Sequence, residues 1–253
     1  STDDTTGDAT DGSGDDTTVE DTTPPFDMEH PLSWPLEAPG PFAVGYRHFD
    51  HTYVAPGQTE ERTIGINIWY PASEAVGRNP KYLGLDLFID RDVFTDAPLA
   101  PSVYGDHYPV HVYSHGSQGH GGTASDLMHF YASHGWIAIA PDHTGNLLTA
   151  NVDPHPLGLY IWRASDVSES LNVLEHLDPT DPLAGKADTS HVVMSGHSFG
   201  IYGTWALAGV TYDTAAIQTR CDNGDWNDCT PEKLAAFAAG TVRRGRRAVR
   251  PLN

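Results

Sequence analysis

Basic residues are scarce in this sequence, and none occurs before Arg47. Lys and Arg number 14 against 34 Asp and Glu, which gives a formal net charge of -20. Such a charge repels phosphate backbones, so nucleic acid is not expected as a partner and a small neutral or zwitterionic molecule is favoured. No run of 18 apolar residues occurs either, so no transmembrane segment is expected.

The first 30 residues also lack a hydrophobic pattern. Residues 1–25 hold eight Thr and seven Asp, and Val19 is their only large aliphatic residue. Because nothing there could offset the entropy of ordering the chain, residues 1–30 are predicted to be a disordered stalk. The sequence opens on Ser1, which favours a cleaved secretory or lipoprotein signal over recombinant trimming. We therefore expect a secreted or cell-envelope bacterial protein, attached to the envelope through this stalk.

Cysteine is rare as well, with Cys221 and Cys229 the only two. They flank a Gly/Asn/Asp-rich segment, and a local disulfide is the leading interpretation, which would agree with an oxidising compartment. Two free thiols are the alternative. The acidic and amide side chains between the cysteines could instead wrap Ca²⁺, although their spacing does not match an EF-hand loop. The cysteines have no nearby His partner, so no zinc site is predicted.

The body of the chain, residues 31–240, begins with β-rich runs and continues with alternating strands and helices. Residues 42–54 and 62–70 are β-rich runs around a Pro-Gly turn and predict an antiparallel hairpin. Residues 74–107 lack periodicity and predict a long loop or insertion. From there on, strands and helices alternate, which is typical of a mostly parallel sheet with helices on both faces. The predicted strands are 109–116, 136–142 and 190–198, and the predicted helices are 125–135, 158–177 and 201–210.

Helical spacing also predicts which side chains share a face. In the first helix these are Leu127, Phe130 and Tyr131. In the second helix the side chains expected to point inward are Ile161, Val167, Leu171, Val173 and Leu174.

A G-x-S-x-G motif joins the third of these strands to the third helix. Its residues are Gly196, His197, Ser198, Phe199 and Gly200. The glycines permit a strained strand-to-helix turn, which exposes the Ser198 hydroxyl beside the start of a helix. This context predicts the nucleophile elbow of an α/β-hydrolase, with Ser198 as the nucleophile.

A Gly-rich loop after the strand at 109–116 carries a second motif, which begins at His115 and Gly116. In α/β-hydrolases this loop supplies one backbone N–H of the oxyanion hole, and the residue after the nucleophile supplies the other. The donors are therefore predicted to be the N–H groups of Ser117 and Phe199. The alternative is a turn that only caps the strand.

Five segments together carry a resemblance to a known family. They are NIWYP at 67–71, YPVHVYSHG at 108–116, APDHTGN at 140–146, the pair Arg163 and Asp166, and GHSFG at 196–200. Over about residues 40–212 the chain resembles bacterial relatives of platelet-activating factor acetylhydrolase and dienelactone hydrolase. The resemblance implies hydrolysis of short-chain carboxylic esters, such as an acetyl ester or a phospholipid acetyl ester, through an acyl-enzyme and without a cofactor. Arg163 and Asp166, three residues apart, are predicted to be a structural ion pair.

The chain departs from the family pattern after the nucleophile. The order in this fold is Ser, then Asp or Glu, then His, but no histidine follows Ser198. The acids that follow Ser198 all come before a next strand could begin: Asp213, Asp222, Asp225, Asp228 and Glu232. An upstream histidine such as His120 or His143 is not placed by the fold's order to replace the missing base.

The last positions differ abruptly in composition from the rest of the chain. Five Arg lie within the last eleven residues. A basic tail could dock on an anionic surface, but a frameshift or a misassembled gene is the favoured interpretation for residues 241–253. We therefore expect the later strands of the sheet to be missing, which leaves the elbow strand at an unpaired edge.

Three functional hypotheses follow from the sequence. The first is a serine esterase by ancestry that acts on a small ester. The second is an inactive hydrolase-like binding or surface protein. The third is a hydrolase whose acid and histidine come from a partner chain.

Overall fold

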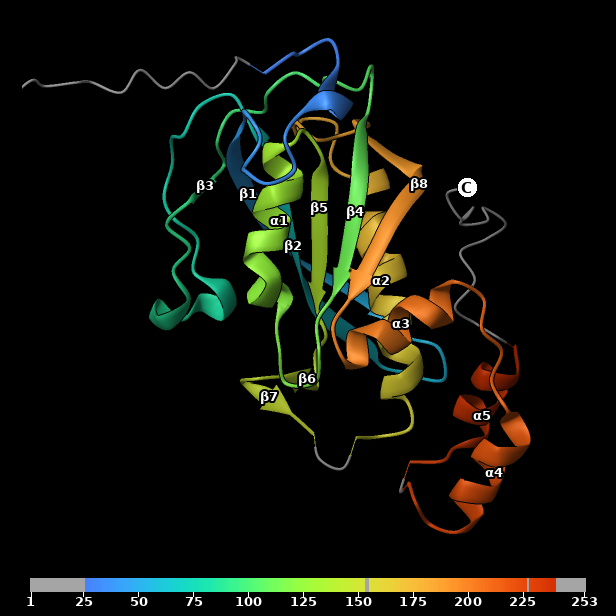
Figure 1. Cartoon of the computed structure of the whole chain (residues 1–253). Coiled ribbons are helices and arrows are strands. Elements are labelled where there is room, and N and C mark those ends of the chain that lie inside the picture. Colours follow the sequence, from blue (N-terminus) through green and yellow to red (C-terminus); the bar gives the residue numbers. More distant parts are fainter. Residues whose placement is uncertain (1–25, 153–154, 227, 240–253) are drawn as a thin grey trace, which may run out of the picture.

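The computed structural model describes residues 26–152, 155–226 and 228–239. Its main sheet has six strands in the order β3-β1-β2-β5-β4-β8 (Figure 1). The strands are β1 (Ala43–Val54), β2 (Glu61–Ala72), β3 (Val93–Thr95), β4 (Tyr108–Ser114), β5 (Ile137–Asp142) and β8 (Ala187–Gly196), and a separate two-stranded sheet joins β6 (Asn146–Leu147) to β7 (Ala150–Asn151).

Five α-helices and four short 3-10 helices complete the described chain. The α-helices are α1 (Ser125–Ser133), α2 (Leu159–Glu175), α3 (Phe199–Leu207), α4 (Thr214–Asp222) and α5 (Pro231–Ala239). The 3-10 helices are η1 (Pro31–Ser33), η2 (Tyr82–Gly84), η3 (Asp86–Phe88) and η4 (Gly121–Ala124). Among the helices of the described ranges, none has both the length and the apolar character needed to cross a bilayer.

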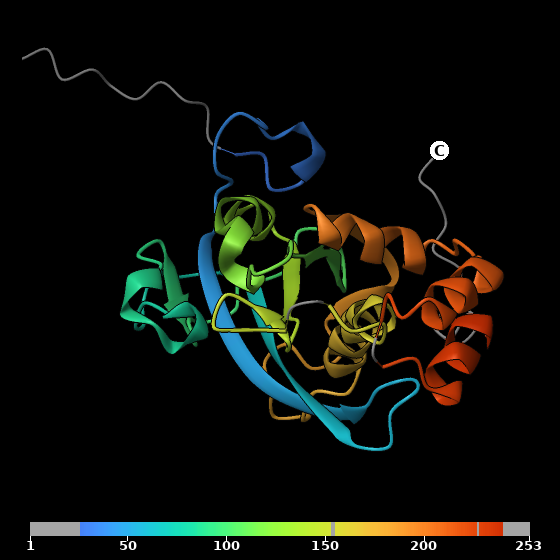
Figure 2. The ribbon, with the colours of Figure 1, turned by 90° about the horizontal axis from the view of Figure 1, so that it is seen from below.

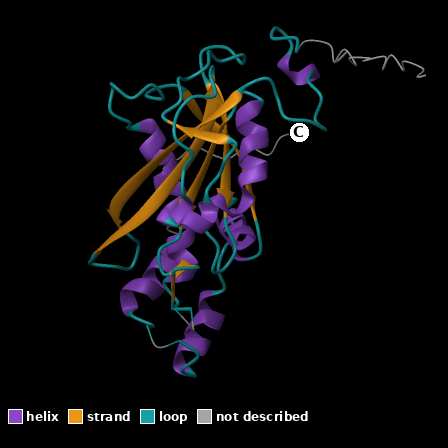
Figure 3. Cartoon of the chain, turned by 90° about the vertical axis from the view of Figure 1, so that its left-hand side faces the viewer, coloured by secondary structure: helices purple, strands orange, loops and turns teal. Residues whose placement is uncertain are grey.

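The sheet confirms the predicted α/β architecture. The opening hairpin pairs β1 with β2 in antiparallel register, whereas β5, β4 and β8 run parallel. Alternate side chains of β2 point to opposite faces, so Ile66 packs toward α2 and Trp69 toward α1. The helices therefore cover both faces of the sheet (Figure 3).

Two predictions about local structure were wrong. The segment 74–107 is not a plain loop, because β3 within it pairs in parallel with β1 at one edge of the sheet. Three residues are too few to show a periodicity, which explains why the sequence does not reveal this strand. In α1 the buried residues are Met128, Ala132 and Ser133, while Leu127 is exposed. The inward face is therefore rotated by about one residue from the predicted one.

The predicted strand at the sheet edge is β8, which pairs with β4 and with no other strand of the described ranges. After α3, the described residues form α4 and α5, which pack on the ends of α2 and α3 (Figure 2). A disulfide joins Cys221 to Cys229, as predicted, and links α4 to the segment before α5. The predicted Arg-rich tail at 241–253 and residues 1–25 of the predicted stalk lie outside the described residues.

Candidate active site

Ser198 occupies a sharp turn between β8 and α3. Its backbone has φ 52° and ψ −115°, a conformation that residues other than glycine rarely adopt. The side chain is exposed, and the residue follows the carboxyl end of β8, whose place in the sheet Figure 1 shows. Strained residues of this kind are held in place by their surroundings and cluster at functional sites. The local geometry is that of a nucleophile elbow.

The two flanking glycines are required by close packing. A Cβ added to Gly196 would lie 2.5 Å from the carbonyl carbon of Gly200. A Cβ added to Gly200 would lie 1.8 Å from the carbonyl oxygen of Ser114, at the end of β4. The helix therefore begins in direct contact with the neighbouring strand, and only glycine leaves room for that approach.

The predicted oxyanion loop lies beside the nucleophile. A Cβ on Gly116 would be 3.3 Å from Cβ of Ser198 and 2.9 Å from Nδ1 of His197. Neither the backbone N–H of Ser117 nor that of Phe199 donates to an acceptor within the described ranges. Two unpaired donors next to an exposed hydroxyl are what acyl transfer requires of an oxyanion hole.

His115 supports this loop from the inside. Its ring is buried, Nδ1 lies 2.6 Å from the carbonyl oxygen of Gly116, and Nε2 accepts the backbone N–H of His143 at 3.1 Å. Burial lowers the pKa of His115 well below its ordinary value, so the ring is neutral. These contacts assign the Nδ1–H tautomer and make His115 a support of the loop.

A second buried residue, Arg163, ties the same loop to its neighbour. Its guanidinium donates to the carbonyl oxygen of His115 and to Oδ1 of Asn146, the latter at 2.6 Å. Asn146 in turn donates from Nδ2 to Oγ of Ser117 at 3.0 Å. Arg163 also lies over the Phe199 ring, with Cζ 4.7 Å from the ring centroid. Burial lowers the pKa of Arg163 to about 9, and nearby Asp166 offsets part of this effect.

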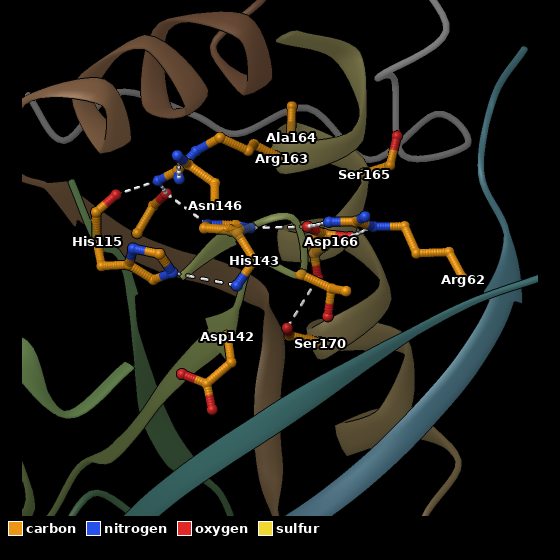
Figure 4. A network of polar contacts seen from close by, with 12 residues as sticks. Arg62, His115, Asp142, His143, Asn146, Arg163, Ala164, Ser165, Asp166 and Ser170 are labelled. Atoms are coloured by element: carbon orange, nitrogen blue, oxygen red, sulfur yellow. Dashed lines mark hydrogen bonds and ion pairs between the residues drawn. The ribbon is translucent and has the colours of Figure 1, made fainter. Parts of the chain in front are cut away.

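The ion pair predicted between Arg163 and Asp166 does not form. Asp166 instead receives two hydrogen bonds of 2.9 Å from Arg62, which lies on β2, 104 residues away (Figure 4). Arg163 points the other way, toward His115 and Asn146. Residues three apart on a helix can pair, but here the two side chains find better partners on the sheet and on the loops.

Asp166 also belongs to a buried Ser–His–Asp arrangement. His143 Nδ1 lies 2.8 Å from Oδ2 of Asp166, and His143 Nε2 lies 2.9 Å from Oγ of Ser114 (Figure 4). All three side chains are fully buried. Substrate cannot reach Ser114, so this arrangement stabilises the strand ends beneath the elbow and does not replace the catalytic triad.

Electrostatics in this buried arrangement favour a neutral histidine and an ionised acid. Burial and, to a smaller extent, the nearby Arg163 lower the pKa of His143 to about 3, although Asp166 acts in the opposite direction. Burial alone would raise the pKa of Asp166, but Arg62 and the hydrogen bond from His143 hold it well below its ordinary value. Asp166 is therefore an anion that Arg62 neutralises.

The far end of the oxyanion loop is held by Asp142. Its Oδ1 accepts the N–H of Gly121 at 2.6 Å, at the start of η4, and its Oδ2 accepts from Asn67 at 3.0 Å. No spacing in the sequence predicts these roles of Arg62, Asn67, Asp142 or Asn146, although the last three lie within the segments 67–71 and 140–146. Their partners lie far away in the chain, and only the fold brings them together.

The two upstream histidines are both engaged in structural contacts. His120 is buried and accepts the N–H of Gly122 at 3.1 Å, and both ring nitrogens of His143 are paired. Ser198 Oγ has no hydrogen-bond partner in the part of the chain that the structure describes. No histidine ring is hydrogen-bonded to Ser198 Oγ within these ranges.

One group of residues has the spacing of metal ligands, namely Asp90, Asp92 and His129. Asp90 Oδ2 lies 2.7 Å from Nε2 of His129 and accepts the hydroxyl of Tyr82 at 2.5 Å. The buried carboxylate is thus already paired by hydrogen bonds. The group lies outside the elbow and joins the segment 82–92 to α1.

Comparison with known proteins is consistent with this geometry. Residues 97–219 match the family model described as Chlorophyllase. No curated protein is significantly similar to the chain. Among solved structures, a ferulic acid esterase from Streptomyces cinnamoneus is similar with a TM-score of 0.49 and 19% identity, over 74% of this chain and 58% of that one. The chain thus spans little more than half of that structure.

None of these matches names the relatives of platelet-activating factor acetylhydrolase or dienelactone hydrolase, so that closer resemblance stays a prediction. The strand order, the strained turn at Ser198 and the family model agree on a broader assignment. By these features, the chain has the α/β-hydrolase fold.

Proposed function

We propose that this chain is a serine ester hydrolase that forms an acyl-enzyme at Ser198. The observation that carries the proposal is the exposed Ser198 in a strained elbow, with the oxyanion loop in contact through Gly116. The match of residues 97–219 to a hydrolase-type family model supports it. A small ester with a short acyl group is the proposed substrate, with an acetyl ester as the simplest case.

The proposed reaction proceeds in two halves. Oγ of Ser198 attacks the ester carbonyl carbon while its proton passes to a base, and the carbonyl oxygen becomes an anion. The N–H groups of Ser117 and Phe199 stabilise that anion, each by about 3–4 kcal/mol. The tetrahedral intermediate then expels the alcohol, which takes up the proton, and leaves the acyl group on Ser198. Water attacks this acyl-enzyme and releases the acid.

The base is not assigned to a residue among 199–253, where the sequence has no histidine. The Ser, acid, His order of the fold would place the base after Ser198, and a partner chain is the alternative source. Loss of a triad histidine lowers turnover on the order of a million-fold, so this group decides how fast the reaction runs.

Hydrolysis of p-nitrophenyl esters of increasing acyl length tests the proposal. The expected result is release of nitrophenol that is fastest for acetate or butyrate and is abolished in Ser198→Ala. Ser195→Ala is a matched control, because Ser195 lies three residues earlier on β8 and bonds to His111 at 2.9 Å, away from the elbow. A folded protein with no turnover and no covalent adduct would instead favour the non-catalytic binding protein.

We also propose that the protein works in a secreted or cell-envelope location. The Cys221–Cys229 disulfide supports an oxidising compartment. Fractionation of the native host with an antibody against the folded domain tests this proposal, and recovery in the cytoplasm with both thiols reduced would contradict it.

A further inference from the structure

His155 lies at the surface beside the oxyanion hole, in the segment that leads into α2. Its ring stacks on Phe199, with the ring centroids 5.6 Å apart and the planes at 13°. Its Nε2 lies 3.0 Å from Oγ of Ser117. His155 therefore touches both residues whose backbone N–H groups form the proposed oxyanion hole.

Arg163 bridges the same two residues from the buried side. It lies against the Phe199 ring. It also donates to Asn146 (Figure 4), and Asn146 in turn donates to Ser117. The Phe199 ring thus contacts both a guanidinium and an imidazole, and each contact is of a kind that stabilises an aromatic side chain. The five residues form a closed circuit of contacts: Arg163, Asn146, Ser117, His155 and Phe199.

The hydrogen bonds of this circuit have one consistent direction. Arg163 can only donate, so Asn146 Oδ1 accepts and its Nδ2 donates to Ser117. At the other end, the carbonyl oxygen of Val152 lies 3.0 Å from Nδ1 of His155 and can only accept. This contact places the proton of a neutral His155 on Nδ1, so its Nε2 accepts the hydroxyl proton of Ser117.

We propose that His155 is a positioning residue that closes this circuit and fixes the two oxyanion donors relative to Ser198. The proposal rests on the proposed ester hydrolysis for its benefit to catalysis, but its geometry is independent of it. Arg163 holds Ser117 and Phe199 from within, and His155 holds them from the solvent side. Donors fixed in advance avoid reorganisation when the negative charge develops.

The tautomer of His155 gives the first test, and it needs no activity. In ¹⁵N-labelled protein above the titration range of the ring, long-range ¹H–¹⁵N spectra should show Nδ1 protonated and Nε2 unprotonated. In Ser117→Ala the preference should weaken, because Nε2 loses its donor. An Nε2–H tautomer in the folded wild type would overturn the proposal.

Amide signals give the second test. In His155→Ala the backbone amide signals of Ser117 and Phe199 should shift and their ¹H–¹⁵N heteronuclear NOE should fall, because the side chains of both residues lose the contact that holds them in place. His155→Phe keeps the stacking on Phe199 and should restore the Phe199 amide but not that of Ser117. His191→Ala, at an exposed histidine near the start of β8, is the matched control and should leave both amides unchanged. Unchanged Ser117 and Phe199 amides in His155→Ala would overturn the proposal.

Labelling by a fluorophosphonate separates this inference from the proposed function. If the wild type reacts, His155→Ala should react about tenfold more slowly and His191→Ala at the wild-type rate. If the wild type does not react while the tautomer and amide results are as expected, the proposed function fails and the positioning role of His155 stands. Equal rates in the wild type and His155→Ala would overturn the role.

Discussion

Gly200 lies so close to Ser114 that an added Cβ would sit 1.8 Å from the Ser114 carbonyl oxygen. This contact fixes the start of α3 against the end of β4, and so places Ser198 beside the loop that carries Ser117. The atoms nearest to Gly200 are backbone atoms of Ser114 and His115. A larger residue at position 200 could therefore not be accommodated by the movement of a side chain alone.

A pair of glycine substitutions tests this contact. Gly200→Ala should lower the free energy of unfolding by at least about 3 kcal/mol, because strand or helix must shift to admit the methyl group. Gly203→Ala, one turn later, should raise it by roughly 0.5–1 kcal/mol, because its added Cβ meets only Ser114 Oγ at 3.6 Å and alanine favours a helix. Urea unfolding followed by tryptophan fluorescence measures both. Equal effects in the two variants would contradict the packing described.

The elbow shows how far a sequence can specify a site. G-H-S-F-G is a contiguous motif, so the turn between strand and helix could be predicted locally, although Gly200 also packs against Ser114 on β4. The opening hairpin and the alternation from β4 to α3 were likewise predictable, because periodicity is local. The expected strand at 109–116 and the expected helix at 158–177 agree with β4 and α2 to within two residues at each end.

Contacts between distant residues could not be read in the same way. Arg163 and Asp166 have the spacing of an ion pair, yet Asp166 forms its hydrogen bonds with Arg62 and His143 instead. Arg62 lies on a strand whose position opposite α2 depends on the order of the sheet. The same holds for His155, which reaches Ser117 and Phe199 only because the fold brings it beside the loop after β4 and the start of α3.

Replacing Asp166 by a neutral residue should lower the free energy of unfolding. In Asp166→Asn the Arg62 guanidinium loses its anionic partner while it stays buried, so a loss of about 3–5 kcal/mol in unfolding free energy is expected. Asp188→Asn, at an acid half-exposed beside His191, is the control and should change stability little. Chemical denaturation at pH 7 provides the comparison. A loss below about 1 kcal/mol for Asp166→Asn would show that the pair does not stabilise the fold.

The buried His111 should make the stability of the folded protein depend on pH. Burial lowers its pKa to about 4, so the unfolded chain binds a proton near pH 6.5 that the folded chain does not. Stability should therefore fall as the pH drops from about 6.5 to 4, by up to about 1.4 kcal/mol per pH unit from this residue. In His111→Phe, which keeps the stacking on Tyr131, the slope over this window should be smaller by that amount. An unchanged slope would mean that His111 is charged in the folded protein.

The disulfide should hold α4 and α5 against the rest of the domain. Cys221 and Cys229 close a short loop, and Asp228 within it accepts the N–H groups of Leu157 at 2.8 Å and Gly158 at 3.3 Å at the start of α2. The double variant Cys221→Ser/Cys229→Ser should lose about 2–3 kcal/mol. Hydrogen exchange should rise first in α4, α5 and the first turn of α2. Faster exchange spread evenly over the sheet would contradict this local role.

Mass spectrometry of protein treated with a fluorophosphonate tests the central claim most directly. Ser198 is the exposed hydroxyl in the elbow, so the account predicts a single phosphonyl adduct on the peptide that contains Ser198, lost in Ser198→Ala and retained in Ser195→Ala. An adduct on Ser117, or labelling that survives Ser198→Ala, would contradict the claim that Ser198 is the nucleophile.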